Sequence, residues 1–164
     1  MAVTYEPIST TTLTSAQSSV TFGNGGTLPQ TYTDLVLIVN SSKTTSGIGN
    51  IYLRFNPGTG GTYSDTFIYG TGSSALAGRH NNFTYGLVGD QSNTSSMLVC
   101  DIMNYSNSSV YKQTLFKYAD ISDALLSGVM MWSSTAAVTS LEVSVPGLSF
   151  SSGSTFTLYG IKAA

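Results

Sequence analysis

Short stretches in which apolar and polar residues alternate recur along this chain about every 10 to 15 residues, separated by clusters of Gly, Asn, Ser and Pro. The clearest is NIYLRFN (Asn50–Asn56), which would place Ile51, Leu53 and Phe55 on one face. Alternation with a period of two is the pattern of a half-buried strand, because successive side chains point to opposite faces of a sheet. Its repetition predicts an all-β protein.

The predicted strands cover most of the chain. They are Ser18–Phe22, Thr33–Ser41, Asn50–Asn56, Thr66–Tyr69, Phe83–Val88, Ser96–Asn104, Val110–Ala119, Gly128–Ser134, Ser140–Val145 and Ser154–Ile161. The run from Leu35 to Val39 is continuously apolar, which suits a central strand buried on both faces, or one whose second face lies beneath an interface. We therefore expect one antiparallel β-sandwich over residues 1–164, of jelly-roll or Greek-key type and with little helix.

Four segments between the predicted strands have other expected structures. Residues 1–16 are rich in Thr and read as an extended N-terminal arm. Gly70–Asn82 is expected to be a Gly- and Ser-rich loop, and Asn104–Ser109 a hairpin turn. Asp120–Leu126 is the only segment expected to form a helical turn, with Asp at its N-terminal end.

Charge and composition limit the classes of partner that this chain could bind. Only 9% of the residues are charged, against about 25% in ordinary soluble domains, whereas Ser and Thr number 26 and 22. The formal net charge of −2 and the scattered basic residues argue against a nucleic-acid partner. No apolar stretch approaches the roughly 20 residues that cross a bilayer, which argues against a membrane partner. The first ten residues, MAVTYEPIST, lack the pattern of a secretory signal, which predicts synthesis in a cytosol.

Residue types that carry catalysis are scarce. His80 is the only histidine, and no nucleophile motif frames it or the nearby Ser73. Asp120 and Asp123 are better explained by capping of a turn than by acid–base work, and no spacing of acids resembles a calcium loop. Cys100 is the only cysteine and is expected to be a buried apolar residue. We expect a non-enzyme without metal or cofactor.

Tyrosines are the remaining candidates for contact with a partner, because an amphipathic ring suits both protein interfaces and stacking on sugars. The candidates are Tyr5, Tyr52, Tyr63, Tyr69, Tyr105 and Tyr111, which lie in or beside predicted loops or on the outward side of predicted strands. The alternative is that these rings fill the core of the sandwich. Trp132 is expected to be a core residue.

Three segments resemble a known group of proteins. They are LPQTYTDLVLIVN (Leu28–Asn40), LRFNPGTGGTYS (Leu53–Ser64) and FSSGSTFTLYGIKAA (Phe150–Ala164). Together they resemble small virion proteins of tailed phages of marine and freshwater bacteria, cyanophages in particular. The group includes capsid decoration proteins and modules of fibres, and no catalytic residues come with the resemblance.

The resemblance implies a capsid decoration (cement) protein that binds the major capsid protein on the outer surface of the virion after synthesis in the host cytoplasm. It would also bind itself, as a trimer in preference to a dimer. The arm from Ala2 to Ala16 could lie across a neighbouring subunit, and the alternative is a disordered terminus. The alternative is a tail-fibre or head-fibre module whose tyrosines bind host surface glycan.

Overall fold

The computed structural model describes residues 5–44, 49–57, 62–91, 94–121 and 124–162, and all secondary structure in these residues is β. Its strands are β1 (Tyr5–Thr12), β2 (Ser19–Phe22), β3 (Asp34–Ser41), β4 (Gly49–Phe55), β5 (Tyr63–Gly70), β6 (Ala75–Phe83), β7 (Gly86–Gln91), β8 (Ser96–Met103), β9 (Lys112–Asp120), β10 (Leu125–Trp132), β11 (Leu141–Ser144) and β12 (Thr155–Ile161). The prediction of an all-β chain is confirmed.

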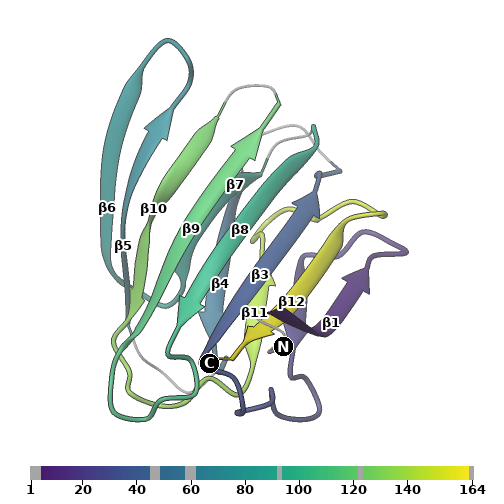
Figure 1. Ribbon diagram of the computed structural model, residues 1–164. Helices are drawn as coiled ribbons and strands as arrows, with labels where there is room; N and C mark the ends of the chain where they lie inside the picture. The colour runs from purple at the N-terminus through teal and green to yellow at the C-terminus, as the bar shows by residue number, and fades with distance from the viewer. Residues whose placement is uncertain (1–4, 45–48, 58–61, 92–93, 122–123, 163–164) are drawn as a thin grey trace.

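The strands form a sandwich of two unequal antiparallel sheets. The larger has eight strands in the order β1-β12-β3-β8-β9-β10-β5-β6, and the smaller has four in the order β2-β11-β4-β7. Figure 1 shows the larger sheet in front of β4, β7 and β11. The predicted β-sandwich is therefore present.

The strand order is that of a jelly roll with two insertions. Four antiparallel pairs are nested in sequence, namely β1 with β12, β2 with β11, β3 with β8 and β4 with β7, and they alternate between the two sheets. Hairpin β5–β6 is inserted between β4 and β7, and hairpin β9–β10 between β8 and β11. The two hairpins pair through β5 and β10 and widen the larger sheet on one side.

The core lies between the sheets and follows the predicted alternation. Ile51, Leu53 and Phe55 of β4 all point inward and are fully buried. Strand β3 lies between β12 and β8, and its Val36 is buried on the face opposite the core. The central position predicted for this apolar run is thus confirmed, and Cys100 and Trp132 are buried as expected.

The expected N-terminal arm is, in its described part, an edge strand. β1 pairs along the length of β12, from Tyr5 opposite Ile161 to Thr12 opposite Thr155. Alternation is weak in this Thr-rich segment, and its partner strand lies at the other end of the chain. The arm therefore belongs to its own sandwich rather than lying free, and residues 2–4 lie outside the described part.

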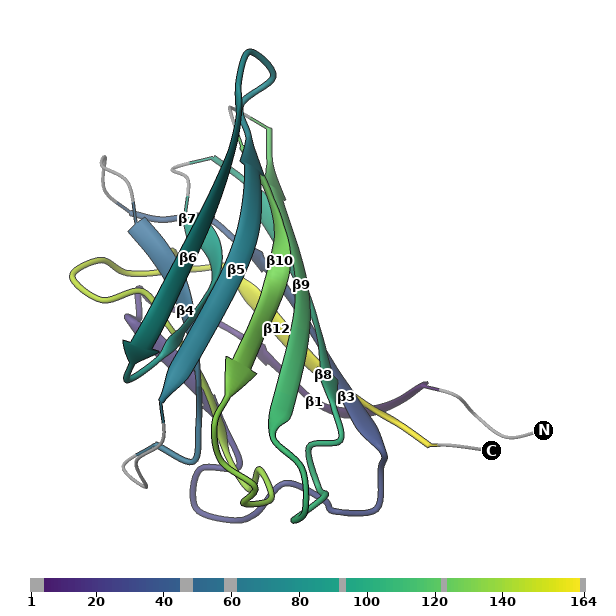
Figure 2. The ribbon, with the colours of Figure 1, turned by 90° about the vertical axis from the view of Figure 1, so that its left-hand side faces the viewer.

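The prediction of a loop over Gly70–Asn82 is wrong, because most of this segment is strand β6. Its Gly-, Ala- and Asn-containing sequence has low intrinsic β propensity. The segment is nevertheless extended because it pairs with β5, from Gly70 opposite Ala75 to Asp65 opposite His80, and this pairing forms the backbone hydrogen bonds of a strand. Only Thr71 to Ser74 form the turn, whose tip projects beyond the other strands in Figure 2.

The helical turn expected over Asp120–Leu126 is also wrong in its described residues. Asp120 ends β9 and Leu125 begins β10, so the segment is a hairpin connection. The Asp120 carboxylate accepts hydrogen bonds from the Ala124 backbone N–H at 3.3 Å and from the Tyr118 hydroxyl at 3.0 Å. The capping chemistry of Asp is thus used in a turn, and residues 122–123, which include Asp123, lie outside the described part.

Candidate binding surfaces

The outer face of the larger sheet is apolar over its central strands. Exposed side chains there come from β8, β9, β10 and β5. They are Met97, Leu115, Leu125, Val129 and Ile68, exposed by 36 to 61%. Cross-strand pairing makes them neighbours, since Leu115 lies opposite Val129 and Ala119 lies between Met97 and Leu125. We call these residues the apolar face.

Charge on this face is limited to one residue of each sign. On the outward side of β5, β8, β9 and β10, the charged residues in the described part are Asp101 and Lys117. The two lie on adjacent strands, two residues out of register, because Lys117 pairs with Val99 and Asp101 pairs with Leu115. A contiguous apolar area with so little charge is a candidate interaction surface.

A second surface is built from a row of aromatic rings. Phe67 of β5 lies 5.6 Å from His80 of β6, which lies 5.2 Å from Phe83, between ring centroids. Phe83 lies 6.2 Å from Tyr85, and Tyr85 lies 4.3 Å from Tyr52 of β4. We call these five residues the aromatic strip. It runs from the inserted hairpin to the smaller sheet, and Phe83 at its middle is 41% exposed.

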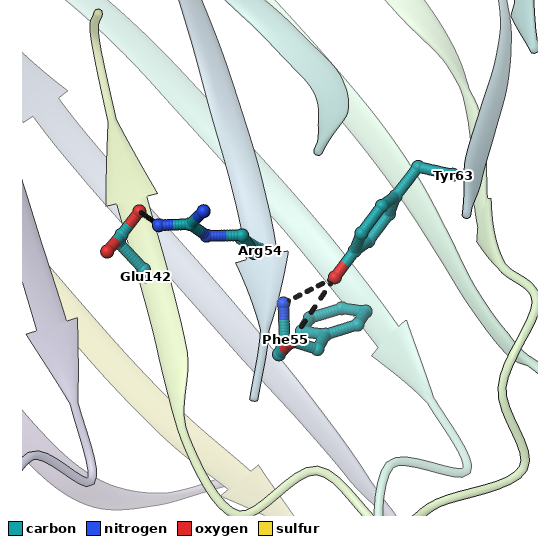
Figure 3. Close-up of polar contacts among 4 residues, drawn as sticks. All are labelled: Arg54, Phe55, Tyr63 and Glu142. Carbon is teal, nitrogen blue, oxygen red and sulfur yellow. Dashed lines mark hydrogen bonds and ion pairs between the residues drawn. The ribbon is translucent and has the colours of Figure 1, made fainter. Parts of the chain in front are cut away.

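A hollow of about 310 Å³ lies at the Tyr85 end of the strip. Most of the residues that line it carry polar side chains. The lining consists of Ser18, Ser19, Arg54, Tyr85, Glu142, Ser144, Pro146 and Gly147. Arg54 and Glu142 lie opposite each other on β4 and β11 and form an ion pair, with Nη2 2.9 Å from Oε1 (Figure 3). The hollow therefore offers a guanidinium, a carboxylate, hydroxyls and one ring.

The strip is held by a buried carboxylate. Asp65 Oδ1 lies 2.7 Å from His80 Nδ1, and Asp65 Oδ2 accepts a hydrogen bond from the Leu87 backbone N–H at 3.2 Å. Asp65 is buried on β5, and these two contacts connect it to β6 through His80 and to β7 through Leu87. His80 is thus a strand residue with an aspartate partner, and not the loop residue expected, while Ser73 and Ser74 lie at the tip of the hairpin.

The structure divides the six candidate tyrosines. Tyr5 and Tyr111 are each 54% exposed, and Tyr52 and Tyr69 are half-buried. Tyr63 and Tyr105 are buried in the core, so the expectation that they face a partner is wrong. The six do not form one site; Tyr52 joins the aromatic strip.

Buried hydrogen bonds explain the two corrections. The Tyr63 hydroxyl accepts a hydrogen bond from the Phe55 backbone N–H at 2.7 Å and donates one to the Phe55 carbonyl at 3.4 Å (Figure 3). Its ring stacks on Trp132 with centroids 6.2 Å apart, and burial raises the pKa of Tyr63 to about 12. The Tyr105 hydroxyl donates to the Pro29 carbonyl, and burial raises its pKa as well. Each ring therefore packs in the core, and its hydroxyl forms hydrogen bonds with backbone groups.

Sequence reasoning pointed to Tyr85 as an exposed aromatic residue but did not group it with His80 and Phe83 on one surface. The alternation of Phe83 and Tyr85 about Thr84 was a usable signal for two side chains on one face. Nothing local indicated that Tyr52, more than 30 residues earlier, completes the strip.

The described residues contain no group of three or more His, Cys, Asp or Glu side chains placed to hold a metal ion. In the same part of the chain, no helix has the length and apolar character needed to cross a membrane. Comparison with known proteins adds no relative, since no protein-family model matches the chain and a search of curated proteins finds no match either.

Proposed function

We propose that this protein is a structural component of a tailed-phage virion, a decoration protein that binds the outer capsid surface by non-covalent contacts. The observation that carries the proposal is the apolar face, whose five large exposed side chains are contiguous on four neighbouring strands. Water at such a surface is released when a second protein covers it, and this release is the main favourable term in protein association.

The size of the apolar face supports a specific contact. The outward sides of the four strands, which are about 4.8 Å apart and have eight or nine residues rising about 3.4 Å each, together cover roughly 500 Å², and the apolar face lies within this area. A standard interface takes about 800 Å² from each partner, so the outward side of these strands is large enough to form more than half of one such contact. Asp101 and Lys117 add one charge of each sign, which would orient the partner without repelling it.

The assignment to a phage particle rests on the resemblance of Leu28–Asn40, Leu53–Ser64 and Phe150–Ala164 to small virion proteins. A hydroxyl-rich, charge-poor composition is compatible with close packing of many copies, because few like charges repel. We expect the copies to bind the major capsid protein and one another, as closed trimers in preference to dimers.

Copy number tests this function. Quantitative densitometry of purified virions is expected to find hundreds of copies per particle, because a decoration protein repeats with the capsid lattice. A few dozen copies or fewer would contradict a decoration role.

Binding to stripped capsids tests the attachment surface. Leu125→Lys and Val129→Lys are expected to weaken binding of the purified protein by more than tenfold, since each buries a charge that no acidic residue opposes on the neighbouring strands. Asn24→Lys, in the turn after β2, is the matched control and should bind normally. Normal binding by the two variants would assign attachment to another surface.

A fibre module that binds host glycan is the second candidate, because the aromatic strip and its polar hollow form a surface of a different kind from the apolar face. Binding of the isolated protein to host cells would favour it, together with a low copy number in the virion.

A further inference from the structure

We propose that the aromatic strip and the adjoining hollow form one binding site for an uncharged oligosaccharide. The two features meet at Tyr85, whose ring belongs to the strip and also lines the hollow. The site does not depend on whether the protein decorates the capsid or a fibre, since it lies apart from the apolar face: Phe67 points to the side of β5 opposite Ile68, and the hollow is lined from β4 and β11 of the smaller sheet.

The rings supply apolar faces for stacking. Successive centroids lie 4.3 to 6.2 Å apart from Phe67 to Tyr52, so the row is continuous, and adjacent ring planes are inclined by 36 to 77°, so each ring offers its own face. Phe83 is 41% exposed and the His80 side chain 39% exposed, which leaves ring surface open to a ligand. The apolar C–H faces of sugar rings pack on aromatic faces, and a continuous row suits a chain of several sugars rather than a single one.

The hollow supplies the hydrogen-bonding groups that sugar hydroxyls need. A hydroxyl both donates and accepts, so it pairs best where donors and acceptors lie together. Arg54 offers guanidinium N–H donors and Glu142 offers carboxylate acceptors, and their side chains are 37% and 17% exposed. Ser18, Ser19 and Ser144 add hydroxyls of the same kind as the ligand's.

The charges in the hollow favour an uncharged ligand over an anionic one. Glu142 neutralises Arg54 at 2.9 Å, so a phosphate, sulfate or uronate entering the hollow would gain one favourable contact and one unfavourable contact. The formal net charge of −2 also disfavours anions.

The site is already ordered before a ligand arrives. Asp65 fixes His80 and the start of β7, and the Asn50 side-chain amide donates a hydrogen bond to the Tyr52 hydroxyl at 3.1 Å. A preformed site loses less conformational freedom on binding than a mobile loop does, which preserves affinity for a polar ligand.

A glycan array tests the inference with the full-length protein. The probes are immobilised neutral, sulfated and uronate-containing oligosaccharides, and the best-bound neutral one is then titrated in solution by calorimetry. Binding to at least one neutral oligosaccharide of several sugars is expected. Absence of binding across the array, or binding confined to the sulfated and uronate probes, would overturn the proposal.

Variants at Tyr85 locate the binding. Tyr85→Leu removes the ring and is expected to reduce affinity at least fivefold, whereas Tyr85→Phe keeps the ring and should retain most of it. Glu142→Gln, which keeps the shape of the hollow, should also weaken binding. Tyr111→Leu, at an exposed ring outside the strip, is the matched control. Equal binding by Tyr85→Leu and the unaltered protein, with unchanged thermal melting, would place the ligand elsewhere.

Discussion

Lys112 is a charged residue whose side chain is fully buried, at the start of β9. Its Nζ donates hydrogen bonds to the carbonyls of Asn107, Val110 and Thr135 at 2.6, 2.7 and 3.1 Å. Burial lowers the pKa of Lys112, but the three carbonyls give the ammonium a full set of acceptors and join the β8–β9 turn to the segment after β10.

Replacing Lys112 by Met is expected to lower the free energy of unfolding by about 2–4 kcal/mol, because the three carbonyls that bond its buried ammonium lose a charged donor. Urea denaturation measures the change. Lys117→Met is the matched control on the same strand, where the side chain is exposed, and should change stability little. A Lys112→Met protein as stable as the unaltered one would show that water replaces the ammonium.

Tyr63→Phe is expected to cost about 1–3 kcal/mol, because the Phe55 backbone N–H would be left buried without an acceptor. The ring contact with Trp132 would remain, so the loss reports the hydroxyl alone. Thermal and chemical denaturation measure it. Tyr111→Phe removes an exposed hydroxyl and should be neutral; equal effects of the two changes would contradict the assigned hydrogen bond.

At the scale of the strand, Gly128 allows β10 to fit between β5 and β9. A Cβ at this position would lie 2.4 Å from the Thr66 backbone oxygen and 2.7 Å from Phe116 Cζ. The nearest atom is backbone, so the strand itself would have to shift. A glycine inside a strand is otherwise unfavourable, and here close packing explains it.

Gly128→Ala is therefore expected to destabilise the protein by about 1–3 kcal/mol, despite the higher β propensity of alanine. Its neighbour Ser127 faces outward, so Ser127→Ala serves as control and should be close to neutral. The melting temperatures of both variants test this. A Gly128→Ala protein with unchanged melting would mean that β5 and β10 separate without cost.

Edge strand β1 is attached to the rest of the fold by hydrogen bonds of Glu6, and their strength depends on pH. The Glu6 carboxylate accepts hydrogen bonds from Lys162 Nζ at 3.0 Å and from the Tyr32 hydroxyl at 2.9 Å. These bonds, with Lys162 first, hold the pKa of Glu6 below its ordinary value of 4.5. A carboxyl whose pKa is lower in the folded state than in the unfolded state stabilises the fold when ionised.

Protection of the β1 amides from hydrogen exchange is therefore expected to be higher in the unaltered protein than in Glu6→Gln above about pH 4.5. The difference should shrink as the pH falls through the lowered pKa of Glu6, where the carboxyl is protonated. Comparison of protection factors at each pH separates this effect from the intrinsic exchange rate. A difference that persisted unchanged in acid would exclude ionisation of Glu6 as its cause.

For the whole molecule, the two inserted hairpins have the largest consequence. Without β5–β6 and β9–β10, the nested pairs would form a jelly roll of two four-stranded sheets. With them, the larger sheet extends past the smaller one. The insertions contribute Leu115, Val129 and Ile68 to the apolar face, and Phe67, His80 and Phe83 to the aromatic strip. Both proposed surfaces are thus built on additions to the basic sandwich.

The described ends of the chain lie side by side, since Tyr5 pairs with Ile161 (Figures 1 and 2). A circular permutant with the ends joined by a short Gly-Ser linker and reopened at Gly72, in the β5–β6 turn, is expected to keep its circular dichroism spectrum and cooperative melting. Reopening inside β3 at Leu37 should abolish folding, because both neighbouring strands lose a central partner. Failure of the Gly72 permutant would show that the turn is needed for folding.

Local pattern was sufficient where burial alternates along one strand. Ile51, Leu53 and Phe55 faced the core as predicted, and the continuous apolar run became the central β3. It was insufficient where partners distant in sequence decide the structure, as for β1, which pairs with β12, and for β6, a strand whose composition reads as loop. The apolar face, which includes Leu115, was not predicted either, because alternation along a strand does not say which side of the sheet is covered.

The all-β class, the sandwich and most strand positions followed from the order of residues alone, because a side-chain period of two is a local property of extended backbone. Three features came only from the tertiary structure: the nested strand order, the burial of Tyr63, Tyr105 and Lys112, and the meeting of Tyr52 with Tyr85 in the strip. Each depends on which distant segments pack together, and that is decided by hydrogen bonding and burial summed over both sheets rather than by any single stretch of the chain.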